Sequence, residues 1–211
     1  MFERKTYAAL AEWKRISNGR TAALIEGARR VGKSTVAEAF ARAEYDDYLL
    51  LDFSQESEEV RRNFRENIGN LDTFFRNLFL LKEKSLVPGT SVIILDEVQL
   101  FPLARQAVKQ LVRDGRYHYI ETGSLISIKQ NTERILVPSE EHRIRMHPMD
   151  FEEFLWAKGD TITANAIREA FEHKRSLGDD IHRAIMRSFR EYLAVGGMPQ
   201  VVASFVSGEI L

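Results

Sequence analysis

The chain has 211 residues, of which 44% are hydrophobic, so it is long and apolar enough to bury a core in one domain or a little more. Its 30 basic and 31 acidic residues give a net charge of -1, which excludes the overall basic character of many nucleic-acid-binding proteins. It has no cysteine, which excludes disulfides, thiolate zinc sites and a cysteine nucleophile.

The N-terminal sequence, MFERKTYAAL, lacks the apolar core of a signal peptide, and no later run approaches the length of a membrane span. We therefore expect a cytoplasmic protein that does not contact a membrane. Residues 5–17 are predicted to form the first helix, with Leu10 and Trp13 on its apolar face.

A short apolar strand at 21–26 and an amphipathic helix at 35–43 flank the sequence GARRVGKS. This sequence fits the phosphate-loop pattern G-x-x-x-x-G-K-[ST] at each required position. The alternative is a glycine turn that only links two elements. The order of strand, loop and helix is the one that a phosphate loop requires, and it favours nucleotide binding.

The residue types of this loop suit a triphosphate. Gly27 and Gly32 permit the unusual dihedral angles and close approach that a loop needs when its N–H groups surround a phosphate. Lys33 would place its charge between the β- and γ-phosphates, and Ser34 would bind Mg²⁺. Arg29 and Arg30 either clamp the triphosphate or point to solvent, and we expect solvent for at least one. The expected nucleotide contacts are Gly27, Ala28, Arg29, Arg30, Val31, Gly32, Lys33, Ser34 and Thr35.

Residues 48–53 form the next predicted strand, which completes a β-α-β unit with the first strand and helix. A charged helix is expected to open at 54–57. The helix predicted at 71–82 is amphipathic, and its apolar residues are expected to lie in the core rather than at a cofactor.

The strand predicted at 91–95 is a continuous apolar run, typical of a parallel sheet that is covered on both faces. It ends in Asp96 and Glu97. An acidic pair at a strand end is often only a helix cap or a solvated turn, but after a phosphate loop it matches the Walker B element. Asp96 would then hold Mg²⁺ through water, and Glu97 would accept a proton from the attacking water.

A helix after Pro102 leads to a fourth strand at 117–122, which is followed by Gly123 and Ser124. Ligands of open α/β sheets bind at the carboxyl ends of the strands, so Thr122 and Ser124 are expected beside Glu97 and the γ-phosphate. Either hydroxyl could orient the attacking water. Ser124 could instead only cap the helix that follows it.

Residues 143–147 are predicted to be the last strand of a parallel sheet of about five strands. Asp150 and Glu153 then form a capping box, and Met149 is expected to pack on Phe154.

Three further helical stretches follow, with a break at 196–199. We therefore expect an α/β core at 1–149 and a helical region at 150–211. The sequence stops in what reads as the middle of a helix, so we expect it to be part of a longer protein.

Five segments in this order, GARRVGKST, VIILDEVQ, ETGSLIS, HPMDFEEFL and YLAVGGMP, resemble the AAA-type P-loop ATPases of bacteria and archaea that usually carry an uncharacterised C-terminal domain. The first two segments are general to P-loop ATPases, and the other three are more specific to this group. The resemblance covers most of the chain. It implies an AAA-like core with a helical lid at 150–211, ATP and Mg²⁺ as cofactors, and a further domain beyond this sequence.

The sequence departs from many of these relatives at His142 and Arg143, which stand in place of Gly-Arg. Two roles for Arg143 are open. It could be an arginine finger that reaches the γ-phosphate of a neighbouring subunit in a homo-oligomer, or a surface arginine paired with Glu140 or Glu141. The second role is favoured.

The leading function is Mg²⁺-dependent ATP hydrolysis that is coupled to an unidentified protein or DNA partner. A non-hydrolysing ATP switch is the main alternative, although it would not need a base at position 97. A P-loop small-molecule kinase is a third, and the arginines of the helix near 181–193 would then belong to its lid. Support for nucleic acid is limited to local basic residues. The residues assigned catalytic roles are Lys33, Glu97, Thr122, Ser124 and Arg143.

Overall fold

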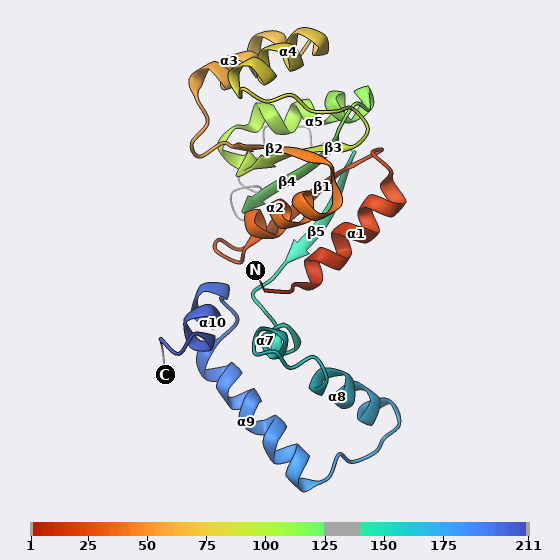
Figure 1. Cartoon of the computed structure of the whole chain (residues 1–211), viewed down its shortest axis with the longest axis vertical. Coiled ribbons are helices and arrows are strands. Elements are labelled where there is room, and N and C mark those ends of the chain that lie inside the picture. The colour runs from red at the N-terminus through yellow and green to blue at the C-terminus, as the bar shows by residue number, and fades with distance from the viewer. Residues whose placement is uncertain (1, 125–139, 210–211) are drawn as a thin grey trace. The chain divides into compact units, whose positions relative to one another are not determined.

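Among the residues that the computed structural model describes, 2–124 and 140–209, five parallel strands form one sheet (Figure 1). The strand order across the sheet is β2-β3-β4-β1-β5. The predicted α/β fold with a parallel sheet of about five strands is therefore confirmed. The strands are β1 (Ala22–Gly27), β2 (Asp47–Asp52), β3 (Ser91–Asp96), β4 (His118–Ser124) and β5 (Glu141–Met146).

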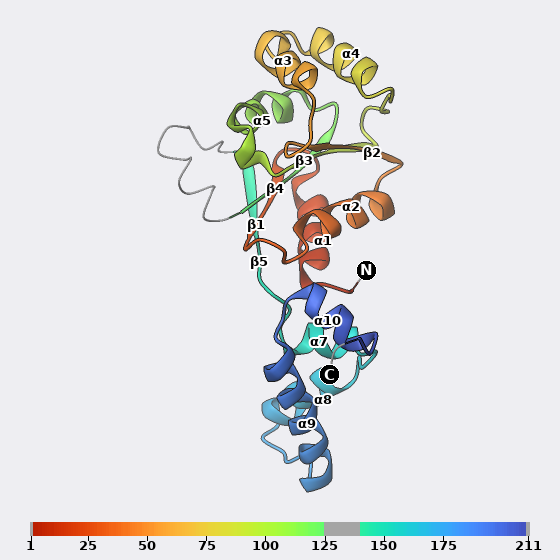
Figure 2. The same cartoon turned by 90° about the vertical axis from the view of Figure 1, so that its left-hand side faces the viewer.

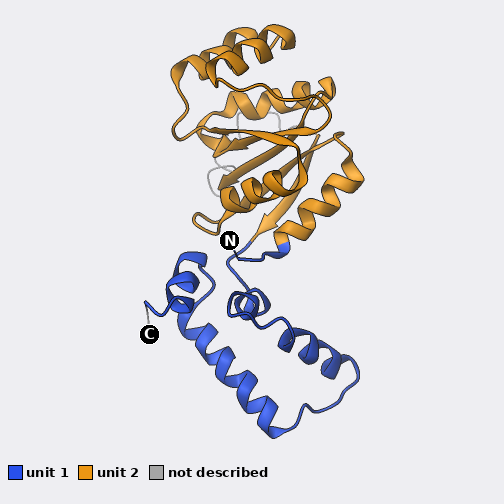
Figure 3. Ribbon diagram, viewed as in Figure 1, with its two compact units in different colours: residues 1–5, 147–211 blue, residues 6–146 orange. Residues whose placement is uncertain are grey.

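Two compact units make up the chain, and Figure 3 colours them separately. The larger unit, Thr6–Met146, contains the sheet. The smaller unit combines Met1–Lys5 with His147–Leu211. The N-terminal residues therefore belong to the same unit as the C-terminal helices.

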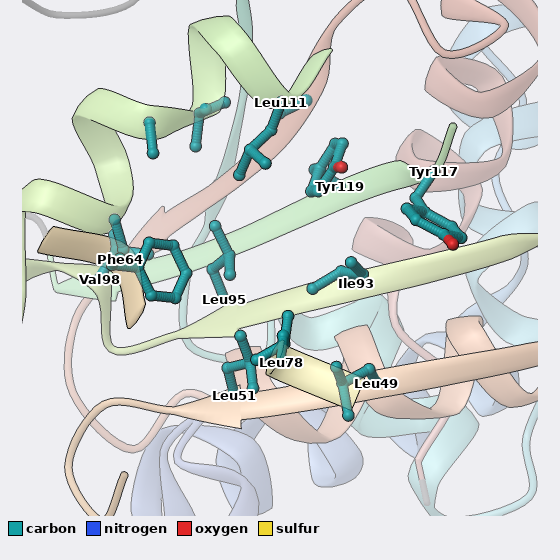
Figure 4. Close-up of a cluster of buried hydrophobic side chains, with 14 of the residues drawn as sticks. Leu49, Leu51, Phe64, Leu78, Ile93, Leu95, Val98, Leu111, Tyr117 and Tyr119 are labelled. Carbon is teal, nitrogen blue, oxygen red and sulfur yellow. The ribbon is translucent and has the colours of Figure 1, made fainter. Parts of the chain in front are cut away.

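Helices cover both faces of the sheet (Figures 1 and 2). One face carries α1 (Lys5–Ser17) and α2 (Lys33–Glu44), whereas α3 (Glu58–Asn67), α4 (Leu71–Leu81) and α5 (Pro102–Asp114) lie on the other side. Such two-sided cover explains why every residue of β1 and β3 is buried. In Figure 4, side chains of β2, β3 and β4 meet those of the second group of helices, including Leu51, Ile93, Leu95, Tyr119, Phe64, Leu78 and Leu111.

The crossover from β1 through α2 does not return to a neighbouring strand. It reaches β2 at the far edge, and β3 and β4 lie between β1 and β2. The predicted β-α-β unit therefore does not pair its own two strands.

Two boundaries differ from the sequence prediction because of specific partners. The charged helix begins at Glu58 rather than at 54–57, since the Asp52 carboxylate accepts hydrogen bonds from the backbone N (2.9 Å) and hydroxyl (2.6 Å) of Ser54 and holds a turn there. Ser57 then caps the helix. β5 begins at Glu141 because Glu141 pairs with Ala22 of β1.

The smaller unit contains α7 (Phe151–Ala157), α8 (Thr163–Glu172), α9 (Asp179–Val195) and α10 (Pro199–Val206). The predicted capping box of Asp150 and Glu153 at the start of α7 is confirmed. Met149, Phe154 and Val202 form its buried cluster. No helix in the described part of the chain is long and apolar enough to cross a membrane.

Gly197 lies against the backbone of Met149. The Met149 N–H donates to the Gly197 carbonyl at 2.7 Å, and the Tyr192 hydroxyl donates to the Met149 carbonyl at 3.1 Å. A Cβ atom at position 197 would lie 2.1 Å from the Met149 oxygen, so glycine alone fits. Gly197 therefore has a structural role, because it lets the segment between α9 and α10 contact the residues at the start of α7.

Candidate functional site

The phosphate-loop sequence connects the end of β1 at Gly27 with the start of α2 at Lys33. Its two glycines meet different requirements. A Cβ atom on Gly27 would lie 2.1 Å from the Met146 oxygen of β5, so Gly27 permits a close approach of two strands. Gly32 has a φ of 94°, in the left-handed region that favours glycine. The loop therefore requires glycine at both positions, for reasons of space and of conformation.

The N-terminus of α2 faces this loop without a side-chain cap. Its N-cap residue is Gly32, which has no side chain that could cap the helix. The N–H groups of a first helical turn and the positive end of the helix dipole are then available to an anion. Val31 is fully buried and anchors the loop, whereas Arg29 and Arg30 are exposed. The backbone therefore suits a phosphate group.

Lys33 is 5% exposed, and its ammonium group points back into the loop. Its Nζ donates to the Ala28 carbonyl at 2.7 Å and lies 3.4 Å from the Gly27 carbonyl. Burial lowers the pKa of Lys33, while the carboxylates of Glu97 and Asp96 act in the opposite direction. The lysine charge is thus held inside the loop, close to the acidic pair.

Ser34, Asp96 and Thr122 form a hydrogen-bonded cluster from three elements, α2, β3 and β4. The Ser34 hydroxyl donates to Asp96 Oδ1 at 2.7 Å, and the Thr122 hydroxyl donates to the same oxygen. Thr122 Oγ1 also accepts a hydrogen bond from the Glu97 backbone N at 3.2 Å. Thr122 is fully buried. Its hydroxyl is therefore engaged with both members of the acidic pair.

Glu97 is the first residue after β3 and has a left-handed backbone, with φ 53° and ψ 45°. Its side chain is half-buried, and the Gln99 side-chain amide donates to Glu97 Oε2. Sequence reasoning missed Gln99, although this residue ends the segment VIILDEVQ that suggested the acidic pair. Its contact depends on the turn after Glu97, which residue spacing does not reveal.

Ser124 lies beside the phosphate loop, because it ends β4 and pairs in register with Gly27. It is 3% exposed. The helix that Ser124 was expected to cap lies outside the described residues. Ser124 is therefore close to the loop, as its place at the carboxyl end of β4 suggested.

Arg143 is not brought into this cluster. It pairs in register with Leu24 inside β5, and its Nε lies 4.0 Å from Glu141 Oε2. Glu140, the other partner considered for Arg143, lies 3.5 Å from Arg113. Within the chain, Arg143 thus lies beside Glu141, as in the second role considered for it.

The donor set suits Mg²⁺. Ser34 and Asp96 offer hard oxygen ligands, and Mg²⁺ in nucleotide sites is usually held by one or two protein oxygens together with substrate phosphates and water. Within 2–124 and 140–209, no group of three or more His, Asp or Glu side chains could hold a metal ion. A phosphate-loop site does not need such a group, so the residues present fit the ion.

Comparison with known proteins shows which family the chain resembles. A family model for the AAA domain matches residues 19–155, which include the phosphate loop, the acidic pair and all five strands. A solved structure of C. elegans PCH-2 has a TM-score of 0.42 and 13% sequence identity, over 83% of this chain and 49% of that one. The chain thus spans about half of the length of that structure. No curated protein matches the sequence.

Proposed function

The chain belongs to the AAA domain family, and from this premise we propose that it binds ATP with Mg²⁺ and hydrolyses it, coupling hydrolysis to a protein or DNA partner. The observation that carries the proposal is the cluster at the carboxyl ends of β1, β3 and β4. There a buried lysine, a serine hydroxyl and an acidic pair converge on a loop with an uncapped helix N-terminus.

In this proposal the loop backbone binds the triphosphate, and Lys33 exchanges its contacts with the loop carbonyls for phosphate oxygens. Bound Mg²⁺ would neutralise charge on the β- and γ-phosphates. Ser34 and Asp96 would hold the ion, so the Ser34 hydroxyl would give up its hydrogen bond to Asp96. Charge stabilisation and positioning then supply most of the catalysis.

Glu97 is the proposed general base. It would accept a proton from the water that attacks the γ-phosphorus, while the bond between that phosphorus and the bridging oxygen breaks and ADP leaves. Thr122 would support this step by holding Asp96 and the Glu97 backbone, because its hydroxyl already bonds both. Ser124 is the hydroxyl proposed to orient the water. We propose Arg143 as an arginine finger only across an interface with a second copy.

The proposal is tested by two substitutions with separate expected effects. Lys33→Ala should abolish detectable ATP binding, since it removes the one buried cation of the loop. Glu97→Gln should retain ATP binding and lower turnover by about 10²-fold or more, because general-base catalysis typically contributes that much. Titration with a fluorescent ATP analogue and steady-state phosphate release measure the two properties.

The control is Glu66→Gln, which alters an exposed carboxylate of α3. It should leave both properties unchanged. Turnover should be measured at several protein concentrations, because an arginine supplied by another subunit can be worth 10³-fold or more. Hydrolysis by Glu97→Gln at the parent rate would contradict the assignment of the base. Binding of ATP without turnover at any concentration would favour a non-hydrolysing switch.

A further inference from the structure

We propose that Gln99 is a positioning residue that orients the Glu97 carboxylate for proton transfer. This inference rests on the proposed function, since it concerns the base of the same reaction. Its starting observation is the hydrogen bond from Gln99 Nε2 to Glu97 Oε2. Gln99 is only 7% exposed, so its amide has a fixed place within the site rather than a free one at the surface.

The turn that carries Gln99 is rigidly held. Residues 98–100 form a short 3-10 helix, η1 (Val98–Leu100), whose ends are closed by backbone hydrogen bonds from Leu100 N to Glu97 O at 2.9 Å and from Phe101 N to Val98 O at 3.1 Å. Val98 and Phe101 are buried in the core cluster on both sides of Gln99. The position of the Gln99 backbone relative to Glu97 is therefore determined by the core.

Glu97 itself has an uncommon backbone conformation. A left-handed φ of 53° is disfavoured for a residue with a side chain, and such residues persist where their surroundings determine the conformation. The hydrogen bond from its backbone N to Thr122 fixes it from the side of β4. The bond from Gln99 fixes its carboxylate. The main chain and the side chain of Glu97 are thus each held by a different partner.

The carboxylate held by Gln99 belongs to the residue that directly follows Asp96 at the carboxyl end of β3. Asp96 accepts a hydrogen bond from the hydroxyl of Ser34, which follows Lys33 in the phosphate-loop sequence, at 2.7 Å. In this proposal Gln99 holds the Glu97 carboxylate in the orientation that a base for the γ-phosphate site needs.

An amide is suited to this task. It donates a hydrogen bond to one carboxylate oxygen and leaves the other oxygen for water, and it does not itself take up a proton at neutral pH. A glutamate side chain without such a partner has several rotatable bonds and samples orientations that cannot accept the proton. Misplacement of a catalytic group by about 1 Å can cost about 10²-fold in rate.

The test removes the donor and keeps the volume. Gln99→Met has no N–H group, and we expect it to lower kcat for ATP hydrolysis about 10- to 100-fold while the Kd for ATP changes less than about two-fold. Gln110→Leu is the matched control, because Gln110 also donates its amide hydrogen bond, at 2.8 Å to the Ile68 carbonyl, but it is exposed and lies in the C-terminal half of α5. It should leave both values unchanged.

A double-mutant cycle separates positioning from a general structural effect. If Gln99 acts through Glu97, Gln99→Met should cause no further loss in a Glu97→Gln background. Thermal unfolding of each variant reports whether the fold is intact, and Gln99→Ala provides a second variant if Gln99→Met does not fold.

Four outcomes would overturn the inference. Turnover of Gln99→Met at the parent rate, with Glu97→Gln inactive, would refute the role of Gln99 and leave the proposed function intact. A parallel loss of ATP binding, or an equal loss of turnover in both backgrounds, would show a structural role instead. Parent-like hydrolysis by Glu97→Gln would refute the proposed base, and the role of Gln99 with it.

Discussion

At the scale of single residues, the site depends on close packing around the loop as much as on its charged groups. Gly27 has no side chain, and its Cα faces the Met146 carbonyl of the neighbouring strand. Gly27 is the last residue of β1, and the chain continues from it into the loop that ends at Lys33. Steric fit between β1 and β5 therefore sets the position of the groups that are proposed to bind phosphate.

The substitution Gly27→Ala should destabilise the larger unit by about 1–3 kcal/mol, since its Cβ would overlap a backbone oxygen that cannot rotate away. ATP affinity should fall in parallel. Urea unfolding and ATP titration measure these changes. Gly69→Ala is the control, because Gly69 has open space around it and no left-handed φ. Equal stability of the two variants would contradict the steric argument.

Glu121 is a buried carboxyl group that the proposed reaction does not use. It lies in β4, fully buried, and within the described residues neither of its carboxyl oxygens has a hydrogen-bond partner. Burial raises the pKa of Glu121 well above its usual value, the carboxylate of Glu141 raises it further, and Arg105 acts in the opposite direction. We therefore expect this carboxyl to be protonated in the folded protein.

This raised pKa predicts how stability depends on pH. The folded state retains a proton that the unfolded state loses above a pKa of about 4.3, so the contribution of Glu121 to stability falls as pH rises through that value toward the folded pKa. Glu121→Gln removes this pH-dependent loss of stability. The free energy of unfolding of the variant, relative to that of the parent, should therefore increase from pH 5 to pH 8. Urea unfolding at several pH values tests this, with Glu66→Gln as the surface control. A stability difference independent of pH would contradict the expected protonation.

At the scale of elements, hydrophobic periodicity and capping residues predicted most helices and strands, because both are local signals. The strand order and the start of β5 could not be predicted, since they depend on pairing with residues far away in sequence. The phosphate loop and acidic pair follow from a motif. The roles of Gln99 and Glu121 do not follow from a motif. The contact of Gln99 arises only when η1 forms after β3, and the environment of Glu121 arises only when α5 covers β4.

Gly197, in the segment between α9 and α10, allows a prediction for the smaller unit. Gly197→Ala would place a Cβ 2.1 Å from the Met149 oxygen and should disrupt the backbone contact between the start of α7 and the segment before α10. We expect a loss of about 1–3 kcal/mol, seen as faster amide hydrogen exchange in α7 and α10. Unchanged exchange in α7 would show that this contact does not stabilise the unit.

At the scale of the whole molecule, the two units differ in how they are built. The larger unit has a sheet covered on both faces and carries every residue proposed to bind ATP. In the smaller unit, α8 and α9 contribute no buried residue, and its buried cluster comes from the start of α7 and from α10. The chemistry proposed for the chain therefore belongs to the unit with the extensive core.

The most direct test of the account is a single-turnover measurement of phosphate release, with the protein in excess over ATP and Mg²⁺ present, for the parent and Glu97→Gln. This condition reports hydrolysis of bound ATP without a contribution from repeated product release. We predict that the parent converts its bound ATP to ADP and phosphate, whereas Glu97→Gln binds the same ATP and releases phosphate about 10²-fold more slowly or not at all. Equal rates for both proteins would contradict the proposal that this cluster is an ATP hydrolysis site with Glu97 as its base.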